Sequence, residues 1–380
     1  MKRSLYFYTI IFSALATAAH AERTLGGDYS AFKNHLSNAY GISYNLDYSV
    51  MLQRTSPSGK HNAVQSYLAP SIAWTNFNNE YGTGTLNIGY SSVFYGHHDA
   101  SDIAGNSGFA TPINDEDDES QEFSSLYYTY QLPHRYNWLT LGLGQYTLYA
   151  FDGTDYDNNQ QANFINYSLS QNGSATYSDA GLGAYVQATP GNWLLVAGFQ
   201  DATNISATSV RFNHLDEKHY TTFAQVGYNP SINGWGNGQY SIMLYNQPNV
   251  SEQPQTTNGW SINMQQNFGE KFALFGRING VSGQMATIKN SYVGGMVYNN
   301  PFDRNSLDQL GLAYAYNDID ADAVGQNLYE SGEHVIEAYW AIGLSKWATI
   351  TPDLQFYIHP ALNAKSDYGT AASLRLSVFF

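Results

Sequence analysis

The sequence predicts an all-β protein: a transmembrane, antiparallel, up-and-down β-barrel, most simply of 16 strands, with a short N-terminal helix and long external loops. Three observations predict it. Apolar and polar residues alternate in runs of about ten residues, which is the length of a tilted membrane-spanning strand. Charged residues make up only 12% of the chain, while aromatic residues reach 15%. The last residue is Phe380, at the end of an alternating run, as is typical of outer-membrane barrels.

Composition excludes several other classes. The net charge of −15 argues against a nucleic-acid partner, because such proteins are basic. The 43% of hydrophobic residues is too high for a disordered acidic chain. The chain has no cysteine, which removes disulfides, thiolate nucleophiles and cysteine-based zinc sites.

Residues 1–21 read as a secretory signal peptide. A basic start at Lys2-Arg3 precedes an apolar run from Leu5 to about Ala18, and Ala19-His20-Ala21 has the small-x-small pattern of a cleavage site. Cleavage is expected before Glu22. An N-terminal membrane anchor is the alternative, but the run is short for a bilayer span.

Residues 22–40 form a lead-in to the barrel. Phe32, Leu36 and Tyr40 lie at helical spacing, which predicts a short helix or plug. A plain N-terminal arm is the alternative reading of this segment.

Residues 41–380 are predicted to form the barrel. In residues 42–53 the side chains Ile42, Tyr44 and Leu46 begin an apolar face, and the residues between them are polar. Successive strand side chains point to opposite faces, so this run has one lipid-facing and one lumen-facing side. The same alternation recurs in residues 86–91, 125–132, 139–144, 260–265, 336–344, 350–358 and 372–380. A soluble β-sandwich would also alternate, and it is the alternative fold.

The strand number follows from chain length. Removal of the signal leaves 359 residues, and 16 strands then take about 22 residues each with their loops; 14 or 18 strands are the alternatives. A barrel of this size leaves a water-filled lumen. The weakly patterned stretches 96–122, 152–178, 202–217 and 318–333 are expected to be external loops. Residues 160–169 are either a helix folded into the lumen or a helix of an external loop.

Several segments resemble the OprB-type family of carbohydrate-selective porins. The most specific is the C-terminal block from Glu333 to Trp340, followed by Trp347, Pro352-Asp353, Gln355 and His359-Pro360. This block is similar to the family's ending, E-x-x-x-E-x-Y-Y, then W-x-x-x-x-P-D-x-Q, then N-P. Weaker likenesses are Asn300-Pro301 with Asp308-Gln309-Leu310-Gly311-Leu312, Pro190-Gly191-Asn192-Trp193, and Leu36 with Gly41-Ile42 and Tyr48.

The resemblance implies a 16-stranded channel in the outer membrane of a Gram-negative bacterium. It would pass monosaccharides or short oligosaccharides into the periplasm by diffusion and would need no cofactor. The charge of the mature chain motivates the alternative of a general or cation-preferring porin. A plugged structural or adhesive barrel is the lesser alternative. No Ser-His-Asp set, phosphate loop or zincin motif stands out, so an enzyme is not predicted.

Sugars need hydrogen-bonding groups and aromatic platforms, and the lumen-facing positions of the predicted strands supply both. Opposed acidic and basic rows would also place a transverse field across a pore. Arg277 and Arg375 are the best basic partners for Glu337 and Asp353. The alternative is that these residues make wall contacts with no role toward substrate. The pore-lining candidates are Asp47, Gln53, Gln265, Arg277, Glu337, Tyr339, Asp353, Gln355, Tyr357 and Arg375.

The acidic run Asp115-Glu116-Asp117-Asp118-Glu119 has two readings. It is either a solvated loop or a weak candidate for holding divalent cations that bridge lipopolysaccharide. His97-His98-Asp99 is a weaker metal candidate still, because no second ligand pair stands in register. The remaining expected partners are outer-membrane lipids, the barrel assembly machinery through Phe380, and two further copies of the chain in a trimer.

Overall fold

The computed structural model describes residues 25–58, 61–212, 215–283, 286–325 and 328–380. The predicted signal peptide lies outside these residues. The helices are α2 (Leu25–Tyr40), α3 (Ala100–Ser107), α4 (Tyr167–Ser170) and α5 (Ala321–Val324), with short 3₁₀ turns η1 (His134–Tyr136), η2 (Leu148–Phe151) and η3 (Leu215–Glu217). The strands are β1 (Ile42–Ser56), β2 (Asn62–Asn79), β3 (Gly82–Tyr95), β4 (Ser120–Gln131), β5 (Leu139–Tyr146), β6 (Gly181–Ala188), β7 (Trp193–Asp201), β8 (Tyr220–Tyr228), β9 (Ser231–Ile232), β10 (Gly236–Gln247), β11 (Thr257–Phe268), β12 (Phe272–Ser282), β13 (Ile288–Asn299), β14 (Gln309–Ile319), β15 (Gly332–Gly343), β16 (Ala348–Ile358) and β17 (Tyr368–Phe379).

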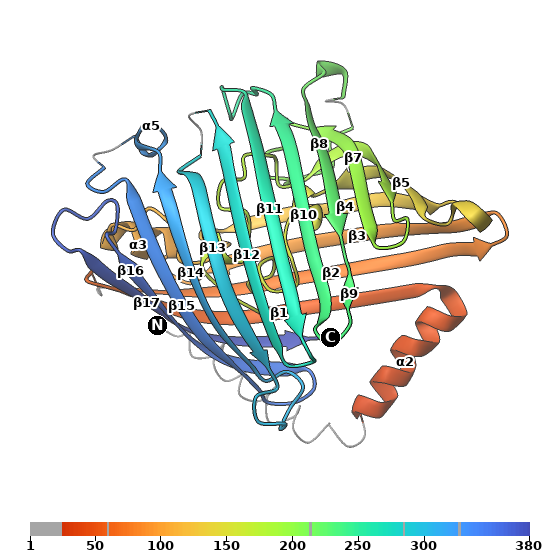
Figure 1. Cartoon of the computed structure of the whole chain (residues 1–380), viewed down its shortest axis with the longest axis horizontal. Coiled ribbons are helices and arrows are strands. Elements are labelled where there is room, and N and C mark those ends of the chain that lie inside the picture. The colour runs from red at the N-terminus through yellow and green to blue at the C-terminus, as the bar shows by residue number, and fades with distance from the viewer. Residues whose placement is uncertain (1–24, 59–60, 213–214, 284–285, 326–327) are drawn as a thin grey trace.

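The strands form one closed antiparallel barrel (Figure 1). Each long strand pairs with its neighbours in the chain, and β1 pairs with β17 from Asp47↔Phe379 to Ser56↔Thr370, which closes the ring. The two-residue β9 is a small addition beside β10, so the barrel itself has 16 strands. The predicted fold class and strand number are confirmed. Closure pairs the backbone groups of every long strand and leaves no open edge toward lipid.

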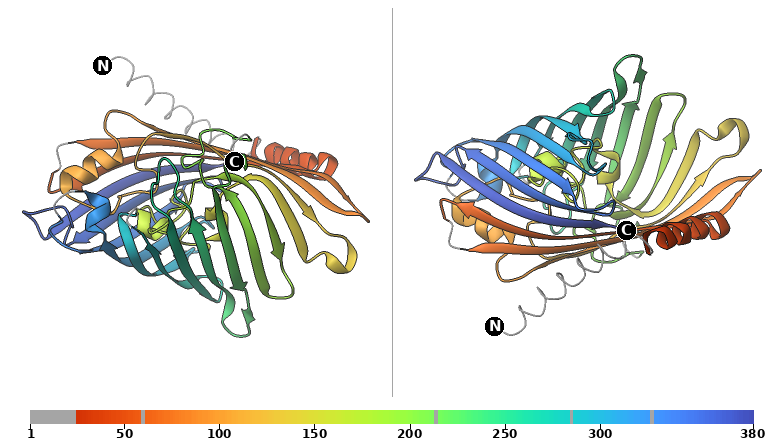
Figure 2. Two further views of the ribbon diagram at one scale, coloured as in Figure 1. Left: turned by 90° about the horizontal axis from the view of Figure 1, so that it is seen from above. Right: turned by 90° about the horizontal axis from the view of Figure 1, so that it is seen from below.

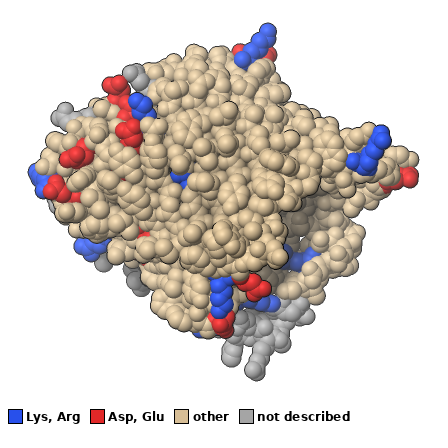
Figure 3. Space-filling model, in the orientation of Figure 1, with Lys and Arg blue, Asp and Glu red and all other residues tan. Residues whose placement is uncertain are grey.

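The two faces of the wall differ as the alternation predicts. Leu143, Leu354 and Leu374 point outward and are 67%, 52% and 46% exposed. Their neighbours toward the lumen are mostly polar and buried, such as Ser373 and Arg375 on either side of Leu374. On the face drawn in Figure 3 the wall is largely free of charge, and charged side chains gather at its margins, where loops and turns lie.

The two ends of the barrel differ in their connections. At one end, which we call the short-turn end, strands are joined by links such as 80–81 and 269–271. At the other, the long-loop end, segments 96–119 and 147–180 join β3 to β4 and β5 to β6. Helix α2 leads into β1 at the short-turn end, where its Tyr29 ring lies 6.2 Å from that of Phe380. Within the described ranges, no helix has the length and apolar character needed to cross a bilayer.

The segment 147–180 enters the barrel. The sequence predicts residues 160–169 either as a helix inside the lumen or as a helix of an external loop. In the structure only the last part of this stretch is helical, in α4. Figure 2 shows this yellow-green segment enclosed by strands in both views. The rest is irregular because side chains of the wall bind its backbone groups in place of helical hydrogen bonds. The expectation that the long loops are external is therefore wrong for this segment. It is also wrong for residues 109–116 of the loop 96–119, which pack against the lumen side of the wall.

Inward-facing aromatic rings cover glycines on neighbouring strands. Gly311 of β14 stands opposite Tyr339 of β15, and a methyl group added at Gly311 would lie 2.1 Å from that ring. The Tyr339 hydroxyl donates to Gln309, so displacing the ring also breaks a hydrogen bond. Such pairs of an aromatic ring and a cross-strand glycine fix the register between neighbouring strands.

We expect Gly311→Ala to destabilise the barrel by about 1–3 kcal/mol, because a small-to-large change in a packed site forces side chains and backbone to move. The midpoint of urea unfolding in detergent would measure it. Gly294→Ala is the control, since an added methyl there meets nothing within 4 Å. Equal midpoints for the two variants would contradict the packing argument.

Candidate functional site

A cavity beside the inner wall lies between strands β1 to β4 and the inserted segment 147–180. Its volume is about 480 Å³, which is within the range of small-molecule sites. The wall contributes residues such as Tyr67 of β2 and Glu122 of β4, and the inserted segment contributes residues such as Tyr149 and Asp179. We call this space the inner cavity.

The inner cavity is acidic. Six carboxylate side chains line it, and none of its described lining residues is Lys, Arg or His; the six are Asp47, Asp115, Glu116, Glu122, Asp152 and Asp179. The other lining groups include the rings of Tyr67, Tyr90, Tyr149 and Tyr167 and the hydroxyls of Ser71, Ser91, Ser124, Ser125 and Thr147. The arrangement offers hydrogen-bond acceptors, hydroxyls and aromatic faces with a negative potential.

Burial within the barrel disfavours the charged forms of these loop carboxyls. It raises the pKa of Asp115 to about 7, with Arg277 opposing the shift and Glu122 and Asp117 adding to it. Burial, together with the charges of Glu122 and Asp115, raises the pKa of Asp179 to about 8. The cavity therefore holds carboxyl groups that change charge near neutral pH.

Of the pore-lining candidates, Asp47 lines the inner cavity. The other nine also face the lumen side of the wall, but they are buried beneath the inserted segments; their exposed fractions are 5% or less. Three of them bind the segment that follows α3. Gln53 and Gln355 donate to the Ile113 carbonyl at 3.5 and 2.8 Å. The Tyr357 ring stacks on Phe109 at 3.9 Å, and Tyr357 Oη donates to the Thr111 carbonyl at 3.3 Å.

Five of the remaining six candidates, all but Asp353, contact the segment 147–180. Gln265 Oε1 accepts from the Asp155 amide at 3.0 Å. Arg277 pairs with Asp157 of the inserted segment, Nη2 to Oδ2 at 3.0 Å, and not with the strand carboxylates Glu337 and Asp353 as the sequence predicts. Glu337 and Arg375 bind backbone groups of residues 160–166, and Asp353 is among the acidic groups that act on Arg375. Tyr339 packs its ring on that of Phe164 at 4.8 Å.

The residues of the acidic run 115–119 do not share one environment. Asp115 and Glu116 line the inner cavity. Asp118 accepts from Ser101 Oγ at 2.7 Å, and Glu119 accepts from the Tyr95 amide at 3.2 Å, so both are bound to nearby loop and strand. The carbonyl of Asp117 accepts from the Ala100 amide at the start of α3. Among the residues the structure describes, no three His, Asp or Glu side chains are grouped as a metal ion needs.

Several cavity residues were missed by sequence reasoning. Tyr149, Asp152, Tyr167 and Asp179 lie in the unpatterned segment, where no periodicity marks a face. Tyr67 and Glu122 are on strands, and their inward positions could have been read from alternation with their neighbours.

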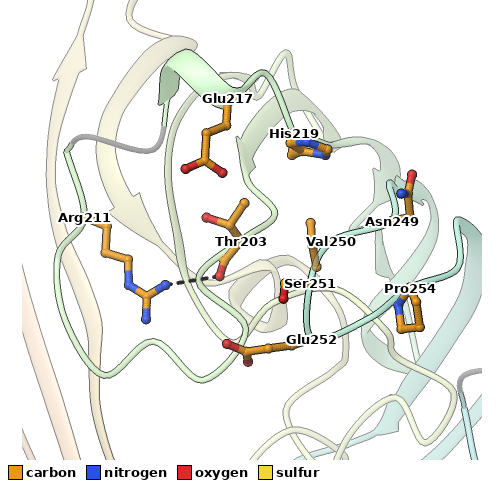
Figure 4. Close-up of a pocket in the computed structure, with 9 residues that line it drawn as sticks. All are labelled: Thr203, Arg211, Glu217, His219, Asn249, Val250, Ser251, Glu252 and Pro254. Atoms are coloured by element: carbon orange, nitrogen blue, oxygen red, sulfur yellow. Dashed lines mark hydrogen bonds between the residues drawn. The ribbon is translucent and has the colours of Figure 1, made fainter.

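A second cavity, of about 430 Å³, lies among loops of the long-loop end (Figure 4). Arg211, Glu217 and His219 come from the β7–β8 loop, and Asn249 and Glu252 come from the β10–β11 loop. Its charges are of both signs, and Arg211 Nη1 donates to the Thr203 carbonyl at 3.4 Å. The inner cavity is the better candidate for the functional site, because it lies against the inner wall.

The chain is similar in sequence and fold to known porins. Residues 72–380 match the model of the carbohydrate-selective porin family named OprB. The chain is 38% identical over 356 residues to porin AaxA of Chlamydia pneumoniae, covering 90% of this chain and 81% of that one. It is 40% identical over 300 residues to porin AaxA of Chlamydia felis, covering 78% and 67%. The high-pH structure of Pseudomonas putida OprB superposes with a TM-score of 0.74 at 13% identity, over 93% of this chain and 97% of that one, and shares its fold.

Proposed function

Because the chain belongs to the carbohydrate-selective porin (OprB) family, we propose that it is an outer-membrane channel through which mono- or short oligosaccharides diffuse passively into the periplasm. The observation that carries the proposal is the inner cavity, which places tyrosine rings, hydroxyls and carboxylates together inside a closed barrel.

This set of groups suits a neutral sugar. The apolar C–H faces of a sugar ring stack on aromatic rings, and its hydroxyls donate to carboxylates and exchange hydrogen bonds with serines. Permeation also requires that binding be weak and spread over several groups, since tight binding would prevent exit. The inner cavity has several such groups on both of its sides.

The second candidate is a general or cation-preferring porin. The six carboxylates of the inner cavity, with no basic residue among its described lining, favour cations over anions. Both candidate functions predict a preference for cations. They differ in whether a sugar in the inner cavity blocks the ion current.

We expect saturable block of ion current by a permeating sugar when the refolded protein conducts in a planar bilayer. Tyr67→Ala is expected to raise the half-blocking sugar concentration about fivefold, because a lost aromatic contact is worth about 1 kcal/mol. Tyr292→Ala is the matched control, since that ring is 48% exposed on the outer wall. Open channels that ignore every sugar would leave the cation-preferring porin. Absence of any current would favour a plugged structural or adhesive barrel.

Partners and processing belong to the same proposal. We propose cleavage after residue 21, contact of the apolar wall with lipid and lipopolysaccharide, and assembly as a homotrimer. Recognition by the barrel assembly machinery through Phe380 is supported by its place at the short-turn end, where its amide donates to the Leu46 carbonyl at 3.0 Å.

A further inference from the structure

We propose that Glu337 and Arg375 are positioning residues that set the width of the pore by clamping residues 160–166 of the inserted segment from beneath. This proposal rests on one part of the proposed function, that the barrel conducts, and does not require that sugars pass through it. It concerns residues that a permeating molecule does not meet, since both side chains are at most 1% exposed.

Glu337 holds the segment by its backbone N–H groups. Its Oε1 accepts from the Ile165 amide at 2.6 Å, and its Oε2 accepts from the Asn166 amide at 2.9 Å. Hydrogen bonds to an ionised acceptor are among the stronger ones in proteins. Displacing the segment would break both hydrogen bonds, so the closed arrangement is favoured over a displaced one.

Arg375 holds the same segment by its carbonyl groups. Its Nη1 donates to the Gln160 carbonyl, and its Nη2 donates to the Asn163 carbonyl at 3.1 Å. A planar guanidinium with fixed donors suits two acceptors at once, which a lysine ammonium does less well. Because Glu337 and Arg375 stand on β15 and β17, with β16 between them, the segment is bound at donors and acceptors over a width of three strands.

The clamp lies behind the surface that faces the pore. The segment that it holds also carries Asn158, Tyr167 and Asp179 into the inner cavity. A shift of residues 160–166 away from the wall would therefore move these lining groups and change the cross-section of the cavity.

The first test is single-channel conductance of Arg375→Ala and Glu337→Ala. Each is expected to change the open-channel conductance by roughly twofold and to broaden its distribution, because an unclamped segment takes several positions in the pore. The conductance of Arg375→Lys is expected to lie between those of the native channel and Arg375→Ala. The lysine keeps the positive charge but cannot make the two-point contact. Arg304→Ala is the matched control, because Arg304 binds Asp308 in a short turn outside the inner cavity. Wild-type conductance in both clamp variants would overturn the proposal.

A second test does not depend on conduction. The chain has no cysteine, so a single Asn163→Cys can be labelled selectively. Asn163 is 6% exposed, and we expect its cysteine to react with a water-soluble thiol reagent at least tenfold faster in Arg375→Ala than in the otherwise native barrel. Equal rates in folded barrels, as judged by their resistance to protease, would overturn the clamp even if no variant conducts. A conducting barrel with no sugar block would refute the sugar channel alone.

A third test uses a designed cross-link to restore the conductance of the Arg375→Ala variant. Ser377 Oγ donates to the Gln161 carbonyl at 2.8 Å, so the pair Gln161→Cys/Ser377→Cys is chosen to join the segment to β17. In the Arg375→Ala background, oxidation of this pair should restore the native conductance, and reduction should remove it again. Failure of the formed cross-link to restore conductance would show that residues 160–166 do not set the pore width.

Discussion

At pH 9, where the Asp179 carboxyl of pKa about 8 is largely ionised, removing three carboxylates from the inner cavity is expected to lower the permeability ratio of K⁺ to Cl⁻ by about tenfold. In Glu116→Gln/Glu122→Gln/Asp179→Asn, half of the six lining carboxylates are lost and no basic lining residue takes over. A carboxylate about 8 Å from a permeating ion contributes on the order of 1 kcal/mol at an effective dielectric constant of about 40. Three such contributions, reduced by salt screening, still exceed the roughly 1.4 kcal/mol that a tenfold change requires.

The reversal potential under a KCl gradient measures this ratio directly. The matched control is Glu80→Gln/Glu270→Gln/Glu330→Gln, which removes the same charge from exposed turns and loops outside the inner cavity. A shift of equal size in the control would mean that overall charge, and not the inner cavity, decides ion preference. An unchanged potential in the cavity variant would exclude this cavity from the ion path.

Cation preference is also expected to fall as the pH is lowered from 9 to 5. The pKa of Asp179 is raised to about 8 and that of Asp115 to about 7, in each case chiefly by burial. Protonation of a carboxyl removes its negative charge, so the inner cavity loses charge through this window. Exposed carboxyls titrate near pH 4 and would give no change above pH 6.

Reversal potentials recorded in half-unit pH steps would locate the midpoint. Asp115→Asn/Asp179→Asn is expected to flatten the titration, while the exposed triple variant keeps it. The linked effect on stability has a definite sign: a raised carboxyl pKa in the folded state means that stability is lost as the pH rises through that pKa. A midpoint near pH 4 in the native channel would contradict the buried environment of these groups.

The barrel wall is the part of the fold that the sequence predicted well. Residues 372–380 alternate strictly, and they form β17 with Leu374 outside and Arg375 inside. The same local period gives the wall, its apolar outer face and, through chain length, its strand number. Closure of the ring by β1 and β17 follows because an open edge in lipid would leave backbone groups unpaired.

The candidate site was predicted less well. Arg277, Glu337 and Arg375 were placed on the lumen side by their alternation, but their partners lie 120 to 215 positions away in the chain. No local pattern marks Asp157 or residues 160–166 as those partners. The acidic residues Asp115 and Glu116 stood out as a run, yet their place beside Asp179 depends on two separate segments entering the barrel.

For the runs that alternate clearly, the sequence by itself determined that they form strands and which of their side chains face lipid, because both depend on a two-residue period that any strand must obey. Only the tertiary structure decided what fills the lumen. An irregular segment is positioned by hydrogen bonds to buried charged side chains, and those bonds join residues far apart in the chain, which only the closed barrel brings together. Because of that difference, residues such as Glu337 and Arg375, which alternation places in the lumen, lie beneath the inserted segment, while the inner cavity is lined by Tyr149, Tyr167 and Asp179, which no pattern singled out.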